Sequence, residues 1–246
     1  MGPEKEFSDR SRKPQHSGKG EMMLKREDFT PQRIDELIAE ARKYGPYDAL
    51  THEERENSRQ DFLKNRQSED GLWVFGYGSL LWNPAFEFDH SMPARLYGYR
   101  RSFCLKLSMG RGSAEKPGLM LALDNGGSCN GRGFYIPAQK VESETRILWM
   151  REMLSGAYRA TECKLTLQNG EKVPALTFVV NHQHRRYTPE IDIDEKIKLI
   201  ATGEGYLGTC RDYLSNTVTH LEEINVKDQY LHYLMRKVEN AYPKKK

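Results

Sequence analysis

The spacing of hydrophobic residues predicts helices towards both ends of the chain and strands between them. Near the N-terminus, apolar residues recur every three or four positions after Thr30-Pro31, a pair typical of a helix start. A second helix is predicted from Thr51, because Thr51 and Glu54 have the spacing of a capping box. The second helix has few apolar residues, so we expect residues 29–70 to form a helical arm that packs on another part of the protein.

From residue 71 onward the pattern becomes strand-like. Apolar segments predict strands at 72–76, 95–107, 118–123, 131–136, 158–168 and 172–181. Two Asn-Gly pairs predict turns: one at residues 124–127, between the third and fourth strands, and one at Asn169-Gly170, within a hairpin. Helical periodicity returns at 140–154, 192–202, 209–226 and 228–241. Strands in one run with helices outside it predict an α+β fold for residues 71–242, in place of an alternating βαβ fold.

Composition and charge narrow the classes of protein. Hydrophobic residues make up 37% of the chain and charged residues 30%, which is ordinary for a globular protein. Basic and acidic residues are interleaved and the net charge is only +3, so there is no positive stripe of the kind that binds nucleic acid. No apolar run approaches the roughly 18 residues that span a bilayer, and the first residues lack the apolar stretch of a secretory signal. We therefore expect a cytoplasmic protein with neither a nucleic-acid nor a membrane partner.

The two ends of the chain are polar. Residues 1–28 are rich in charge, serine and glycine and lack apolar periodicity, so we expect a disordered or variable leader. A basic tail at 243–246 ends in three lysines and is expected to be solvated.

The first candidate site lies where the strand 72–76 enters a Gly-Tyr-Gly-Ser turn. Its two glycines allow a sharp turn and the close approach of a ligand, and successive backbone amides in such a turn can hold an anion. Tyr77 and Ser79 would add hydroxyl donors. A tight strand exit around a buried tyrosine explains the same residues equally well, because short glycine motifs are weak evidence. The turn lacks the Gly-x-Ser-x-Gly pattern of a serine nucleophile.

Glu152 is the second candidate. Four residues between 141 and 149, three of them apolar, fall within about 60° of Glu152 on a helical wheel. A carboxylate on an apolar face is poorly solvated, which raises its pKa and suits a general acid or base near neutral pH. The alternative is a structural glutamate paired with Arg151 or Arg159, and the helical wheel alone favours this structural role.

Metal sites and disulfides find little support in the sequence. The four cysteines, at 104, 129, 163 and 210, are far apart and form no Cys-x-x-Cys pair. His182 and His184 fall in a segment typical of an exposed loop, with no cysteine or acidic residue at a ligand spacing. We expect neither a metal nor a cofactor.

Together these segments resemble the ChaC-like proteins, the glutathione-specific γ-glutamylcyclotransferases. Val-Phe-Gly-Tyr-Gly-Ser-Leu at 74–80, followed by Trp-Asn-Pro at 82–84, resembles the N-terminal signature of that family. Trp149-x-Arg151-Glu152-Met153 resembles its catalytic-helix motif, and the residues from Tyr206 to Leu214 resemble its C-terminal part. These motifs follow the family's order from about residue 72 to residue 240, which is far more specific than any single motif.

The resemblance implies a small mixed β-barrel with flanking helices, the γ-glutamylcyclotransferase-like fold, preceded here by the helical arm. It also implies a lyase of glutathione catabolism, which cyclises the γ-glutamyl end of glutathione to 5-oxoproline and releases Cys-Gly. Glu152 would be the acid/base, and no metal or cofactor is implied. The substrate-binding residues implied are Val74, Phe75, Gly76, Tyr77, Gly78, Ser79, Leu80, Tyr158 and Tyr213.

Two alternatives to this function stay open at the level of sequence. One is a cyclotransferase for another γ-glutamyl amine or amino acid. The other is a non-catalytic protein that binds a γ-glutamyl ligand and regulates ion transport. Glu152 argues against the second, because ligand binding alone does not need a poorly solvated carboxylate. In either case we expect a monomer or a weak dimer.

Overall fold

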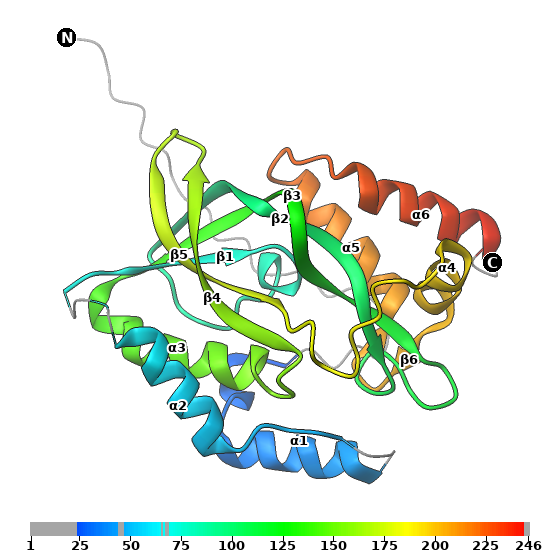
Figure 1. Ribbon diagram of the computed structural model, residues 1–246, viewed down its shortest axis with the longest axis horizontal. Coiled ribbons are helices and arrows are strands. Elements are labelled where there is room, and N and C mark those ends of the chain that lie inside the picture. The colour runs from blue at the N-terminus through cyan, green and yellow to red at the C-terminus, as the bar shows by residue number, and fades with distance from the viewer. Residues whose placement is uncertain (1–23, 44–46, 65, 67–68, 244–246) are drawn as a thin grey trace.

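A small closed barrel of five strands forms the centre of the protein (Figure 1). The computed structural model describes residues 24–43, 47–64, 66 and 69–243. The strands follow the order β1-β3-β2-β4-β5, and β1 closes the barrel by pairing in parallel with β5. Their bounds are Leu72–Gly76 for β1, His90–Leu107 for β2, Gly118–Ile136 for β3, Tyr158–Leu167 for β4 and Lys172–Val180 for β5. Parallel and antiparallel pairs occur together, so the barrel is mixed, as the resemblance implies.

The two longest strands, β2 and β3, pair along almost their whole length, and this corrects one prediction. β3 runs without reversal through residues 124–127, where the sequence predicts a turn. Gly126 and Gly127 take positive φ angles of 95° and 72°, and the register between the two strands slips opposite them. These glycines form a bulge because β2 begins at His90, earlier than the predicted residue 95, and supplies a pairing partner for both halves of β3.

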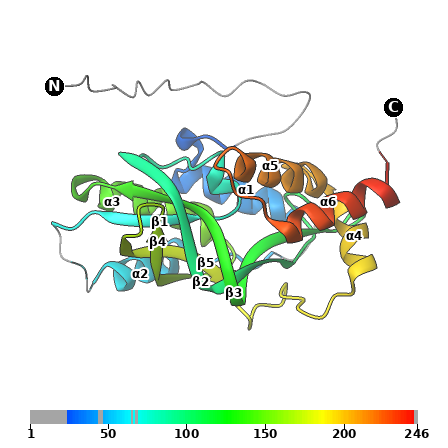
Figure 2. The same ribbon diagram turned by 90° about the horizontal axis from the view of Figure 1, so that it is seen from above.

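Six helices flank the barrel, and none of those in the described part of the chain is long and apolar enough to cross a membrane. Their bounds are Pro31–Lys43 for α1, His52–Leu63 for α2, Ala138–Glu152 for α3, Ile193–Thr202 for α4, Cys210–Glu222 for α5 and Gln229–Ala241 for α6. The predicted helices are confirmed within a few residues, as is the β4–β5 hairpin. In Figures 1 and 2, α2 and α3 lie beside one end of the barrel and α4, α5 and α6 lie beside the other.

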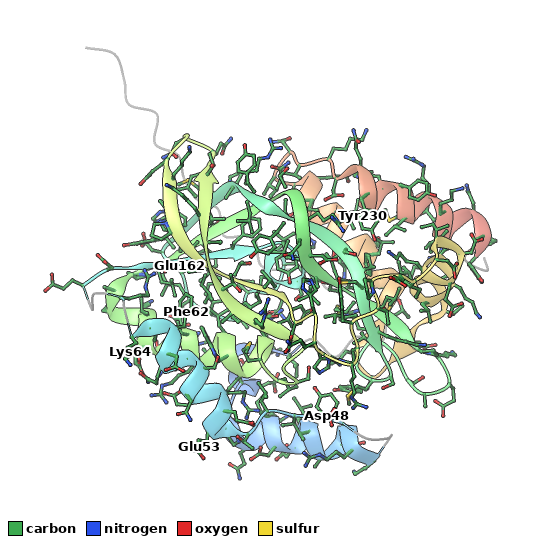
Figure 3. All side chains as sticks on the ribbon, in the orientation of Figure 1. Asp48, Glu53, Phe62, Lys64, Glu162 and Tyr230 are labelled. Carbon is green, nitrogen blue, oxygen red and sulfur yellow. The ribbon has the colours of Figure 1, made fainter. Side chains whose placement is uncertain are left out.

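The helical arm packs on α3. Thr51 forms the predicted capping box at the start of α2. Further along α2, the fully buried Arg59 donates hydrogen bonds to Glu142 of α3, at 2.7 and 3.0 Å. Phe62 lies between α2 and the rest of the domain (Figure 3), with its ring centroid 5.6 Å from that of Trp149. Buried charge and two aromatic rings therefore join the arm to the helix that ends at Glu152.

The segment just before the arm differs from the predicted loose leader of residues 1–28. Arg26–Asp28 form a short 3-10 helix, and Arg26 donates two hydrogen bonds to the buried Glu144 of α3, at 2.5 and 2.8 Å. A charged pair holds this segment on the domain, which hydrophobic periodicity does not reveal. Residues 1–23 of the predicted leader and 244–246 of the predicted basic tail lie outside the described residues.

Candidate active site

A cavity of about 280 Å³ lies where the loop after β1, the end of α3 and the helical arm come together. Further wall residues come from α5, from the start of β4, and from the turn between the short strands Glu204–Gly205 and Gly208–Thr209. Seven of the ten residues predicted for the site line this cavity. They are Tyr77, Gly78, Ser79, Leu80, Glu152, Tyr158 and Tyr213.

The other three predicted residues, Val74, Phe75 and Gly76, do not line the cavity. Val74 and Phe75 are fully buried, and they belong to two different apolar clusters because successive strand residues point to opposite faces. Gly76 ends β1 beneath the Phe134 ring, where a Cβ would lie 2.8 Å from a ring carbon. These residues fix the start of the loop, and the residues that follow line the cavity.

The loop residues are held by the two neighbouring tyrosines. Tyr77 is buried and donates a hydrogen bond to the carbonyl of Phe178 at 2.8 Å. The Ser79 amide lies near the Tyr213 hydroxyl and acts to lower the pKa of that phenol, against the larger effect of burial. At Gly78, a Cβ would lie only 2.6 Å from the Tyr213 hydroxyl oxygen. Glycine is therefore required here for close packing against Tyr213.

Glu152 is the last residue of α3, and its side chain faces the cavity with only 16% of its surface exposed. Burial raises the pKa of its carboxyl above the usual value, in the direction that the helical wheel predicts. Arg151 opposes this shift without cancelling it, since its Nε donates to Glu152 Oε1 at 2.9 Å. Glu152 therefore both pairs with Arg151, as the structural alternative predicted, and faces the cavity, as the catalytic role requires.

Arg151 connects Glu152 to the loop. Its Nη2 donates to Ser79 Oγ at 2.9 Å, so one guanidinium holds both the carboxylate and the serine hydroxyl. The ring of Phe29, from the segment before α1, lies 5.9 Å from the Arg151 guanidinium carbon. This arrangement fixes the position of the Glu152 carboxylate relative to the Ser79 hydroxyl.

Three tyrosines line the same cavity as Glu152. Burial raises the pKa values of Tyr77, Tyr158 and Tyr213, and the negative charge of Glu152 raises each of them further. All three phenols therefore stay neutral at physiological pH. Tyr158 donates to the carbonyl of Leu121 at 2.9 Å. The site thus combines a carboxylate of raised pKa, which suits proton transfer, with one phenol, Tyr213, that donates to no carbonyl among the described residues and can stabilise a developing negative charge.

Sequence reasoning missed two groups of cavity residues. The first is a pair of arginines, Arg111 and Arg186. Arg111 belongs to a Gly-Arg-Gly segment that shares the family resemblance, but it was given no role in the site. The second comes from the arm and its flanking segments: Leu24, Phe29, Ile34, Leu37 and Tyr47. The apolar stripe of α1 was visible in the sequence, but nothing in the sequence indicates what that stripe covers.

The histidines and cysteines have structural partners. His182 Nε2 lies 2.8 Å from Asp124 Oδ1, and His184 Nε2 lies 3.0 Å from the carbonyl of Ser155. All four cysteines are free thiols. Across the described ranges, no three acidic, histidine or cysteine side chains come close enough to hold a metal ion.

Comparison with known proteins identifies a family for most of the chain. The family model described as ChaC-like protein matches residues 72–241. The glutathione-specific gamma-glutamylcyclotransferase of Escherichia coli (strain K12) is 40% identical over 183 residues, covering 74% of this chain and 79% of that protein. The protein of the same name from Schizosaccharomyces pombe (strain 972 / ATCC 24843) is 29% identical over 191 residues, covering 69% of this chain and 92% of that protein.

Solved structures support the fold. A crystal structure of a γ-glutamyl cyclotransferase specific to glutathione from yeast matches with a TM-score of 0.63 and 21% sequence identity, covering 70% of this chain and 96% of that one. A second crystal structure of the yeast enzyme gives a TM-score of 0.59 at the same identity. The barrel with flanking helices is therefore the γ-glutamylcyclotransferase fold.

Proposed function

Because the chain belongs to the ChaC-like family, we propose that it is a γ-glutamylcyclotransferase that converts glutathione to 5-oxoproline and Cys-Gly. The observation that carries the proposal is Glu152, a carboxylate of raised pKa that faces a cavity beside the loop from Tyr77 to Leu80. The names of the relatives from two organisms support the same substrate.

The reaction needs one new bond and one broken bond. The α-amino nitrogen of the γ-glutamyl group attacks its own γ-carbonyl carbon and closes a five-membered ring. The bond from that carbon to the cysteine nitrogen then breaks. At neutral pH the attacking ammonium loses two protons and the leaving nitrogen gains two, so the reaction is balanced without a co-reactant. A single acid/base placed between the two nitrogens can carry these protons in turn.

Glu152 is the acid/base in this proposal. The pKa of its carboxyl is raised towards neutral pH, so Glu152 can accept a proton from the substrate ammonium and return it to the leaving nitrogen. Arg151 orients the carboxylate, and the neutral Tyr213 hydroxyl, which lines the same cavity, is the donor for the negative charge that develops on the γ-carbonyl oxygen. The cavity holds the γ-glutamyl chain bent, and proximity of its ends contributes much of the rate.

Product analysis tests this function. Purified protein incubated with glutathione should release 5-oxoproline and Cys-Gly in equal amounts, and more slowly from γ-glutamyl-alanine. Loss of glutathione without 5-oxoproline would contradict ring closure. Faster turnover of γ-glutamyl-alanine would contradict glutathione as the substrate while keeping the reaction.

The cellular setting follows from the same proposal. We infer that the enzyme works in the cytoplasm, which is supported by four cysteines that are all free thiols. Burial raises the pKa of each thiol, so they are poor nucleophiles and are structural. Fractionation of cells that express the tagged protein tests this location.

A further inference from the structure

Two arginines line the cavity together with Glu152. The guanidinium carbon of Arg111 lies 5.4 Å from the centre of the Tyr213 ring. Arg186 Nη2 donates to Ser155 Oγ at 2.5 Å.

Arg186 is held without an acidic partner. Its Nε is buried and has no hydrogen-bond partner, and within the described residues no carboxylate lies within ion-pair distance of its guanidinium. Asp48, which Figure 3 shows on the segment between α1 and α2, pairs instead with the neighbouring Arg185 at 2.6 Å. A buried guanidinium donor without a partner costs free energy, and a planar carboxylate from a ligand is the group that fits it best.

Arg186 also stands where two cavities adjoin. A second cavity of about 210 Å³ shares four lining residues with the main one: Tyr47, Leu107, Ser155 and Arg186. Ser155 accepts a hydrogen bond from Arg186 at 2.5 Å and lies near Tyr47 of the arm. The guanidinium is therefore held in the wall that the two cavities share.

Arg186 gives the cavity a positive group that complements a substrate with a terminal carboxylate. Arg151 is already paired with Glu152, whereas Arg186 has no carboxylate within ion-pair distance among the described residues. Glutathione carries one carboxylate on its glutamyl end and one on its glycine end, with the reacting amide between them. We propose that Arg186 binds the glycine carboxylate and so selects the tripeptide over γ-glutamyl compounds with an uncharged end. This inference rests on the proposed function.

Kinetics with two substrates test the assignment. Glutathione is compared with its glycine carboxamide, which has the same reacting groups and lacks only the terminal charge. Arg186→Met should raise KM for glutathione roughly 10- to 100-fold, the usual effect of losing a charged hydrogen bond, with little change in kcat. For the carboxamide, the native enzyme and Arg186→Met should have similar KM values. Arg186→Lys should recover part of the preference for the acid.

The control is Arg185→Met, which removes a neighbouring arginine that is paired with Asp48 and should leave the substrate preference unchanged. A native enzyme that turns over the acid and the carboxamide equally well would overturn the assignment, whatever the variants do. So would an Arg186→Met variant that loses activity equally on both substrates. If the native enzyme releases no 5-oxoproline from either substrate, the proposed function itself is wrong.

Discussion

The contact between Gly78 and Tyr213 allows a quantitative test of how the loop is held. In Gly78→Ala, the added Cβ would lie 2.6 Å from the Tyr213 hydroxyl oxygen, whereas its next neighbours, a Leu121 methyl and the Tyr213 ring, are 3.8 Å away. The clash thus involves one atom. Since Tyr213 is buried and packed against Trp82, it cannot move freely, and we expect Gly78→Ala to lower the free energy of unfolding by about 1–3 kcal/mol.

Removing the hydroxyl should remove the clash. Tyr213→Phe alone removes a buried hydroxyl that lies near the Ser79 amide, at a cost of about 1–3 kcal/mol. In the Tyr213→Phe background, however, the Gly78→Ala Cβ meets nothing closer than 3.8 Å. The part of its cost that comes from the hydroxyl should then disappear.

Urea unfolding of the four proteins in this cycle measures the coupling directly. We expect a coupling free energy of about 1–3 kcal/mol between the two positions. kcat/KM should follow the same pattern, because the displaced phenol borders Glu152. An equal cost of Gly78→Ala in both backgrounds would refute the close contact as the reason for glycine at this position.

Three further predictions concern charged groups. Hydrogen bonds from Arg26 and the Glu87 amide keep the pKa of Glu144 below its usual value despite burial, so stability should fall as pH drops through that lowered pKa. Glu144→Gln should lower the free energy of unfolding at pH 7 by about 1–3 kcal/mol, and its stability should no longer fall at acid pH through this group. Urea unfolding at several pH values measures both effects, and an unchanged acid dependence in the variant would contradict the prediction. kcat/KM should fall as pH drops through the raised pKa of Glu152, because its base form is lost; a flat acid limb would exclude it as the base. Neither EDTA nor added zinc should change turnover, since ring closure needs only a base and hydrogen-bond donors; activity lost to EDTA and restored by metal would contradict this.

The local elements were largely predictable from the sequence, because hydrophobic periodicity and capping residues act over short distances. Thr51 begins its helix as the capping box requires, and Asn169-Gly170 closes a hairpin. The same reasoning failed at residues 124–127, where Gly126 and Gly127 form a bulge in one long strand. Turn propensity is local, whereas continuation of β3 depends on β2 as a pairing partner, and this partner is decided by tertiary structure.

The residues of the candidate site also fall into those that the sequence predicted and those that it did not. The residues from Tyr77 to Leu80 and Glu152 belong to contiguous motifs, and the fold brings them to one cavity. Arg186 and the arm residue Tyr47 could not be placed, because they reach the cavity only when segments distant in the sequence fold together. Arg26 was assigned to a loose leader, since a single buried ion pair with Glu144 leaves no periodic signal.

The most direct test of the central claim is Glu152→Gln, compared with the native enzyme in 5-oxoproline release, glutathione binding and thermal midpoint on the same samples. The glutamine keeps the shape of the side chain and an oxygen for Arg151 but cannot accept a proton. A carboxyl of raised pKa destabilises the folded state once pH exceeds its unfolded value, so the substitution should not lower the thermal midpoint at pH 7. We predict a folded variant that binds glutathione and has lost roughly 10²–10⁴ in kcat, the usual contribution of general acid/base catalysis. A stable variant with near-native turnover would contradict the account and leave Glu152 as a structural partner of Arg151.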